Sequence, residues 1–178
     1  MYDRLTKMFR PRVERSYRDV VKAVGELYTT YGSSAVIIAN LSGVKDTLYQ
    51  LHATAAINNA NRTRRYLAAQ TKSAYTDRNA MYEAVVCDYL EANGLSQMVQ
   101  EISDTLREQI LQTILKGEAA GWGVDKIVRE LNAATFPKWM AQRVVRTELA
   151  IAGNTGAMVA ATDVGIECVK EWISATLS

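Results

Sequence analysis

The chain has 178 residues, 48% of them hydrophobic and 22% charged, which excludes wholesale disorder. No apolar run approaches the roughly 20 residues that span a bilayer, and the first residues lack the apolar core of a signal peptide. The single histidine, His52, and two distant cysteines, Cys87 and Cys168, argue against a Cys/His zinc site. A Ser-His or Cys-His catalytic pair would depend on His52 alone. We therefore expect no metal, no cofactor and no membrane partner.

The net charge of +2 conceals an uneven distribution. Residues 1–80 hold 13 Lys and Arg against 6 Asp and Glu, a net +7, whereas residues 81–178 hold 8 against 13, a net −5. All nine tyrosines lie at or before Tyr89, and all three tryptophans lie at or after Trp122. These shifts predict two regions, a basic helical region over 1–94 and a helical subdomain over 95–178. They favour a polyanion or an acidic protein groove as a partner of the first region.

Apolar residues spaced by four and three predict a first helix of about 20 residues, which starts or breaks at Pro11 and ends at Gly32. Its expected buried seam is Val13, Tyr17, Val20, Val24, Leu27 and Tyr31. A helix capped by Ser33 or Ser34 follows and is interrupted at Ser42-Gly43, after which the pattern resumes at Val44. His52 follows an apolar position of that pattern, and we expect it at the surface or at a boundary.

The polar run 56–66 contains Asn58, Asn59 and Asn61, which fit either a hydrogen-bonded layer between helices or an exposed bend. Tyrosines then recur every seven residues and predict one face of a helix that Asn93-Gly94 closes; they are Tyr75, Tyr82 and Tyr89. Cys87 stands beside Val86 on this helix. We expect Cys87 and Cys168 to be small buried hydrophobes.

The second region opens with an amphipathic helix over residues 95–116, followed by a loop at 121–123 and a short helix at 124–131. Phe136-Pro137 breaks the chain, and a long helix runs over 138–161. Residues 166–174 alternate and are rich in β-formers, which predicts a short strand. The fold class is therefore mainly α, with an elongated helical N-terminal region and a helical C-terminal subdomain that ends in a strand.

The helix over 138–161 carries small residues close to one line, which would let a second helix approach; the line is Arg146, Ala150, Gly153, Ala157 and Ala160. Glu148, two residues after Arg146, points about 160° away from it, so the two do not form a pair. Without a second carboxylate or a histidine in register, Glu148 is a poor general base. The sequence therefore predicts no catalytic residue.

Candidate residues for contact with a polyanion lie in the basic region, and they are Arg10, Arg12, Arg15, Arg62, Arg64 and Arg65. Tyr66 and Tyr75 could stack on bases beside them. A solvated helix face, with the tyrosines in a buried seam, explains the same residues, and the tyrosine spacing favours it. The N-terminal arginines could equally enter an acidic protein groove.

The second region also carries an ordered set of short motifs. They are a glycine loop from Gly117 to Gly123, Val124 to Leu131, Ala141-Gln-Arg-Val-Val-Arg-Thr-Glu148, Asn154-x-Gly156, Gly165 and Lys170-Glu-Trp-Ile-Ser174. In this order and spacing the chain resembles the phage head morphogenesis proteins, the Mu protein F-like minor head proteins. The resemblance covers roughly residues 95–178. In the family the final strand runs on into an Asp/Arg-rich stretch and a His, whereas here Ala175 to Ser178 follow, so we expect the completing piece to be missing.

The resemblance implies a minor component of a phage head, associated with the portal protein or the major capsid protein in multiple copies. Such a protein resides in the virion, and in the host cytoplasm during assembly, and acts in DNA packaging or ejection with possible non-specific contact to DNA. The motif residues are expected to hold the subdomain together, and they are Arg146, Thr147, Glu148, Asn154, Gly156, Trp172 and Ser174.

Two other classes of function remain as alternatives. A helical DNA-binding regulator would need a helix-turn-helix with a basic recognition helix, whereas the short helix at 124–131 is balanced in charge. An enzyme, such as a toxin, would need a nucleotide pocket that no motif supplies, because the glycines lack the spacing of a phosphate-binding loop. We therefore expect a protein that acts through its surfaces.

Overall fold

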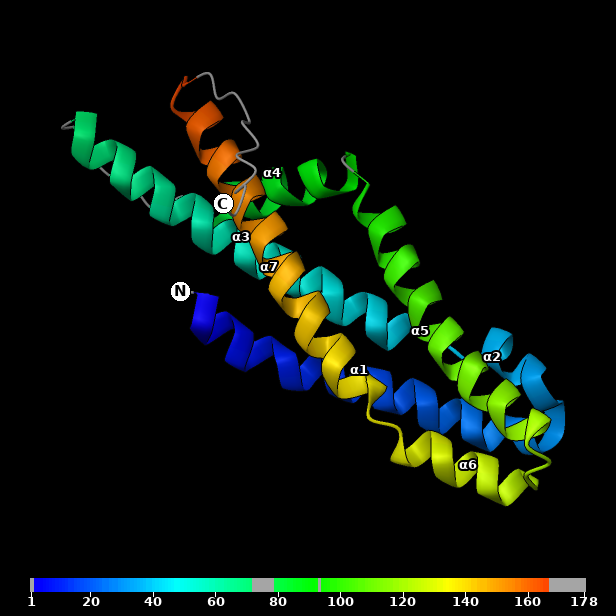
Figure 1. Ribbon diagram of the computed structural model, residues 1–178. Helices are drawn as coiled ribbons and strands as arrows, with labels where there is room; N and C mark the ends of the chain where they lie inside the picture. Colours follow the sequence, from blue (N-terminus) through cyan, green and yellow to red (C-terminus); the bar gives the residue numbers. More distant parts are fainter. Residues whose placement is uncertain (1, 72–78, 93, 167–178) are drawn as a thin grey trace, which may run out of the picture.

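The structure is a computed structural model that describes residues 2–71, 79–92 and 94–166 (Figure 1). Its helices are α1 (Tyr2–Tyr31), a 3₁₀ turn (Gly32–Ser34), α2 (Ala35–Ile38), α3 (Ser42–Thr71), α4 (Asn79–Ala92), α5 (Leu95–Ala119), α6 (Val124–Ala133) and α7 (Phe136–Asp163). All regular structure among the described residues is helical, which confirms the mainly α fold. The strand expected at 166–174 lies outside them, except for Ile166, which belongs to no regular element.

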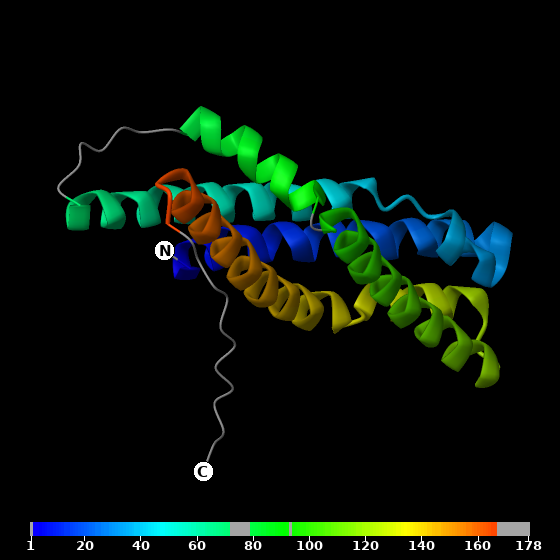
Figure 2. The same ribbon diagram turned by 90° about the horizontal axis from the view of Figure 1, so that it is seen from above.

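Two helices of 30 residues each, α1 and α3, form an elongated framework (Figures 1 and 2). They lie side by side in both views and are antiparallel. The long helix α7 packs on α3 and α1, and α6 packs on α1. Helix α5 packs on α6 and α3 but shares few contacts with α7. Among the described residues, no helix is apolar enough over a sufficient length to cross a membrane.

The first helix does not start or break at Pro11 but passes through it, so that expectation is wrong. Leu5 and Phe9 precede Pro11 at the same spacing of four as Val13 and Tyr17, and all four are buried. Burial of that continuous stripe outweighs the roughly 3 kcal/mol that an interior proline costs a helix.

The far end of the expected seam also differs. Tyr31 is exposed and Leu27 is only partly covered, whereas Tyr28 is buried. The Tyr28 hydroxyl donates a hydrogen bond to the Glu118 carboxylate at 2.9 Å, which ties the end of α1 to the end of α5. Loss of solvent and this neighbouring acid both raise the pKa of Tyr28. The buried face at this end of α1 therefore includes Tyr28 and leaves Tyr31 outside it.

The polar run 56–66 lies within α3 and forms a layer between helices rather than a bend. The Asn59 amide donates a hydrogen bond to the backbone carbonyl of Gly153 on α7, Asn61 is buried, and Asn58 is exposed. At the other end of α3, the Asn40 carboxamide oxygen accepts a hydrogen bond of 2.8 Å from the Ser42 amide, which satisfies a free donor where the helix begins.

The closest approach between α3 and α7 is at Gly156. A Cβ atom placed there would lie 1.9 Å from the backbone oxygen of Ala56. Small residues of α7 thus do admit a second helix, and the predicted stripe is right for Gly153 and Ala160, which are buried, but wrong for its first two members. Arg146 and Ala150 are exposed. The face of α7 that contacts α3 is centred nearer to Gly156 than the predicted stripe is.

On α4, the inward positions are Tyr82 and Val86, both fully buried and four residues apart. Cys87 is exposed, so the expectation that it is buried is wrong: the next residue after Val86 turns about 100° away from the core. Tyr75, Cys168 and the side chain of Tyr89 lie outside the described residues, and their predicted roles stay predictions.

Cys87 is expected to react slowly with alkylating agents despite its exposure. Partial loss of solvent raises the pKa of its thiol, and the charges of Glu83, Asp88 and Glu91 raise it further. A raised pKa means less of the reactive thiolate at neutral pH. In a Cys168→Ser background, iodoacetamide should modify the folded chain several-fold more slowly than the urea-unfolded chain, and the variant Glu83→Gln should be faster than its parent. Equal rates in all three samples would contradict the effect of the acids.

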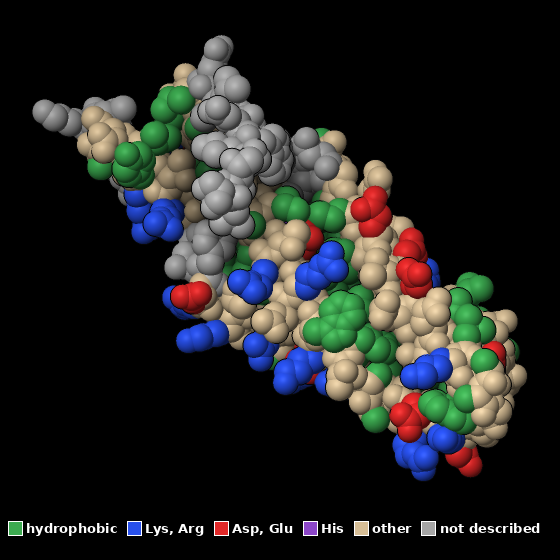
Figure 3. All heavy atoms as spheres, in the orientation of Figure 1, with side chains coloured by type: hydrophobic (Ala, Val, Ile, Leu, Met, Phe, Trp, Pro, Cys, Tyr) green, Lys and Arg blue, Asp and Glu red, His purple; other side chains and the backbone are tan. Residues whose placement is uncertain are grey.

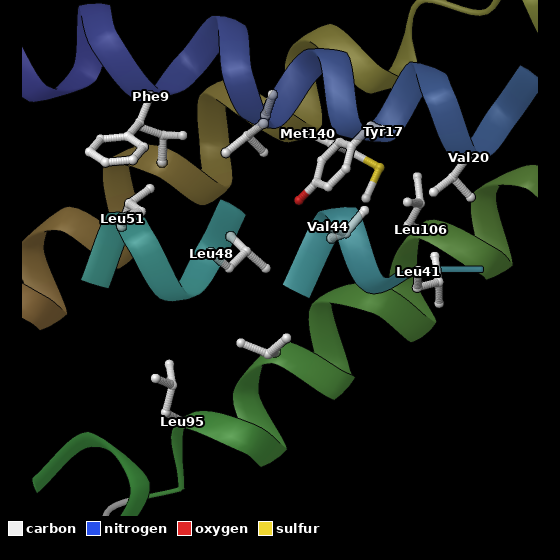
Figure 4. Packing of buried hydrophobic residues seen from close by; sticks show 14 of the residues in the cluster. Phe9, Tyr17, Val20, Leu41, Val44, Leu48, Leu51, Leu95, Leu106 and Met140 are labelled. Carbon is white, nitrogen blue, oxygen red and sulfur yellow. The ribbon is translucent and has the colours of Figure 1, made fainter. Parts of the chain in front are cut away.

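One hydrophobic cluster joins the whole described chain (Figure 4). Phe9 and Tyr17 of α1 face Leu48 and Leu51 of α3, and Met140 of α7 lies beside the Tyr17 ring. The ranges 1–94 and 95–166 both contribute to this cluster, so the boundary at residue 94 does not separate two cores.

Candidate functional site

The six arginines expected to contact a polyanion lie in two groups on the framework. Arg10, Arg12 and Arg15 are exposed on α1, and Arg12 stacks over the Phe9 ring with 5.6 Å to its centroid. Arg12 and Arg15 border a surface hollow of about 510 Å³ that also includes Asp19 and Thr47. Arg12 and Arg15 therefore lie beside the beginning of α3.

The second group lies near the other end of α3. Arg62 and Arg65 are exposed, but Arg64 is largely covered and forms an ion pair with Asp163 at the end of α7. The Tyr82 hydroxyl donates to the same Asp163 carboxylate at 3.1 Å. Arg64 thus joins α3, α4 and α7. Fifteen residues of helix, about 22 Å, separate Arg62 from Thr47, so the six arginines do not form one patch.

The motif residues on α7 occupy different environments. Arg146 and Asn154 are exposed, Thr147 is exposed at the edge of a groove, Glu148 is buried, and Gly156 touches α3. Arg146 and Glu148 point apart, as the helical geometry predicts. Trp172 and Ser174 lie outside the described residues. Glu148 and Gly156 therefore bind the second region to the framework.

Glu148 forms a buried pair with His52, in which the Oε2 atom lies 3.0 Å from Nε2 of the ring. The His52 side chain has no exposed surface, so the expectation of a surface or boundary position is wrong. Its helix is covered on two sides, by α1 and by α7, which buries the residue after Leu51 as well. The interpretation of Glu148 as a residue without a histidine in register is wrong for the same reason.

The hydrogen bonds of His52 indicate which ring nitrogen donates. Its Nδ1 atom is buried and has no hydrogen-bond partner among the described residues. A neutral ring with its proton on Nε2 donates to Glu148 and leaves only a lone pair unpaired, whereas a charged ring would bury an unpaired N–H donor. The contacts therefore fit a ring that donates from Nε2 to the Glu148 carboxylate.

Tyr17 completes this buried cluster. Its hydroxyl is buried and without a hydrogen-bond partner in the described part of the chain. Loss of solvent raises the pKa of Tyr17 far above its ordinary value, and the negative charge of Glu148 raises it further. Tyr17, His52 and Glu148 come from α1, α3 and α7, so the cluster marks the place where the three longest helices meet.

Two adjoining pockets form a groove between α5 and the α6–α7 side of the molecule, which we call the α5–α7 groove. The first pocket, about 420 Å³, is bordered by Met98, Glu101, Ile102, Thr105, Gln109, Trp139, Met140, Arg143, Val144, Thr147 and Glu148. The second, about 340 Å³, is bordered by Gln109, Gln112, Thr113, Lys116, Trp122, Glu130, Ala134, Thr135, Phe136 and Trp139. Gln109 and Trp139 belong to both. Trp139 is 46% exposed, an unusual position for a large aromatic side chain.

The space-filling view shows the two walls of the α5–α7 groove (Figure 3). Acidic side chains gather over α5, basic ones over α7, and hydrophobic side chains lie between the helices. Such a surface can bind another molecule. It does not expose a proton-transfer pair, because the His52 ring is fully covered and Glu148 is only 5% exposed. No group of three potential metal ligands occurs within residues 2–71, 79–92 and 94–166.

Comparison with known proteins gives no match: no family model, no curated protein and no solved structure is similar to the chain at a significant level.

Signals for the buried pair were weak in the sequence. His52 and Glu148 are 96 residues apart, and neither stands in a motif that names the other. The α5–α7 groove also had no usable signal, because Trp139 stands seven residues before Arg146 and so falls on the same line of the helix as the small residues. The hollow beside Arg12 had none.

Proposed function

We propose that the chain is a minor head protein of a tailed bacteriophage, bound to the portal protein or the major capsid protein in the virion. The observation that supports this most is where the shared motifs lie. Gly117 packs against Trp122 and Ile127, Glu148 pairs with His52, and Gly156 touches the framework. The motif residues on which the resemblance rests are thus used for packing, which is what we expect of a structural protein. Its helices would dock on the portal or the capsid wall in several copies and act in packaging or ejection of DNA.

The alternative, a DNA-binding regulator, has less support. Helix α6 is the short helix that would serve for recognition, and it carries Asp125 and Glu130 beside Lys126 and Arg129. A balanced helix gains little from phosphate contact. Catalysis has similarly little support, since the ring of the single histidine has no exposed surface from which to exchange a proton with a substrate.

The proposed function is tested by co-expression with the portal protein and the major capsid protein of the same phage. We expect the full chain to co-elute with one of them on size exclusion and to be detected by mass spectrometry in purified heads. Cross-linking should give several copies per portal ring. Absence from purified heads, or elution of the chain alone with both proteins present, would overturn the proposal.

Contact with DNA makes a separate prediction. Replacing Arg10, Arg12 and Arg15 by Ala should weaken retention on duplex DNA for every sequence, and should reduce the slope of log affinity against log salt by up to about three. The matched control replaces Arg129, Lys138 and Arg146, which are also exposed and carry the same charge. Equal weakening by both triple variants would show that only net charge matters.

A further inference from the structure

In the α5–α7 groove, the pocket of about 420 Å³ is bordered by more acidic than basic side chains. Glu101 on α5 and Glu148 on α7 border the same 420 Å³, and Arg143 supplies one positive charge at the rim. Glu148 is 5% exposed, so its carboxyl group lies at the buried side of this pocket. A buried anion is costly unless a cation or further donors reach it.

The rest of this pocket suits the stem of a long basic side chain. Met98 and Ile102 are partly covered hydrophobic residues of the α5 wall, and Met140 is a buried hydrophobic residue of the α7 wall. Lys and Arg side chains bury their methylene stems on such surfaces while the charged head reaches a polar group. Trp139 at the junction of the two pockets offers an aromatic face of the kind that anchors protein interfaces.

The length of the groove fits a helix. It extends along α5 from Met98 to Lys116, which is about 27 Å of helix axis. Helices α5 and α7 share few contacts, so both walls are open to a third helix between them. When a helix binds in a groove, apolar side chains along one of its faces serve as anchors. Here those anchors would pack against Trp139, Met98 and Met140.

We propose that the α5–α7 groove docks an apolar-faced helix of a partner protein, which inserts one Lys or Arg side chain between Glu101 and Glu148. The inference rests on the proposed function only in taking that partner to be a phage head protein. Arg143 at the rim would pair with an acidic residue on the outer side of the same helix. The site is thus selective for charge as well as for shape.

The test uses the full chain and a blocked, Ala-rich helical peptide of about 18 residues with leucines along one face and a central Arg. The control peptide replaces that Arg by citrulline, which has nearly the same shape and no charge. With methionine methyls labelled with carbon-13, the Arg peptide should shift the Met98 and Met140 signals and leave Met8 unmoved. It should bind about tenfold more tightly than the citrulline peptide.

Two matched variants locate the charge effect on one helix. Glu101→Gln removes an acid that borders the pocket, and Glu108→Gln removes an exposed acid that borders neither pocket. The first should reduce the preference for Arg over citrulline, and the second should leave it unchanged. Equal binding of both peptides, no binding, or shifts at Met8 instead would overturn the inference. Since no phage protein takes part, peptide binding without portal binding would reject the proposed function alone.

Discussion

Gly156→Ala is expected to cost about 3 kcal/mol of unfolding free energy or more, because the added methyl group would meet the backbone of α3. The new Cβ atom would lie 1.9 Å from the carbonyl oxygen of Ala56 and 2.7 Å from its carbonyl carbon. Those atoms belong to the backbone of α3, which cannot rotate away as a side chain could. Overpacking in a close core costs typically about 1–3 kcal/mol, and a backbone contact falls at the upper end. Urea unfolding followed by circular dichroism measures the loss.

Gly43→Ala provides the control for this substitution. Gly43 lies in the first turn of α3, and a Cβ atom there would meet nothing within 4 Å. Alanine favours a helix over glycine by up to about 1 kcal/mol, so the control should be neutral or slightly stabilising. An unfolding midpoint for Gly156→Ala equal to that of Gly43→Ala would contradict the close contact between α3 and α7.

Single helices could be predicted from the sequence because each amphipathic stripe is a local pattern. Val13, Tyr17, Val20 and Val24 are buried as their spacing predicts, and the short helix before Phe136 begins at Val124 as expected. Pro11 misled the prediction because a local penalty was weighed without the burial of Leu5 and Phe9 on the other side of it. Cys87 misled it because an apolar residue beside buried ones was taken to share their face.

Contacts between helices were harder to predict, since they depend on which faces meet. Small residues occur around much of α7, including Ala150, Gly153 and Gly156, and the sequence does not say which of them faces α3. The candidate site also depends on which helix faces meet. Glu148 gains its partner only after α7 crosses α3, and the α5–α7 groove exists because α5 and α7 pack on other helices instead of on each other.

Breaking the buried pair between His52 and Glu148 is expected to destabilise the fold by about 3–5 kcal/mol. His52→Ala would leave the Glu148 carboxylate buried without its donor and would open a cavity where three helices meet. Glu148→Gln should cost much less, because the amide oxygen still accepts the Nε2–H hydrogen bond. Urea unfolding midpoints of the three proteins provide the comparison.

The double variant His52→Leu with Glu148→Met separates the charge from the packing. When both partners are replaced by apolar side chains of similar volume, no polar group is left unpaired, so the double variant should be more stable than His52→Ala. Additive losses from His52→Leu and Glu148→Met measured singly would mean that the two residues contribute independently. Recovery in the double variant would instead mean that the pair specifies how α7 crosses α3 more than it stabilises the crossing. Glu148 borders the α5–α7 groove, so the same double variant should lose the preference for the Arg peptide while it remains folded.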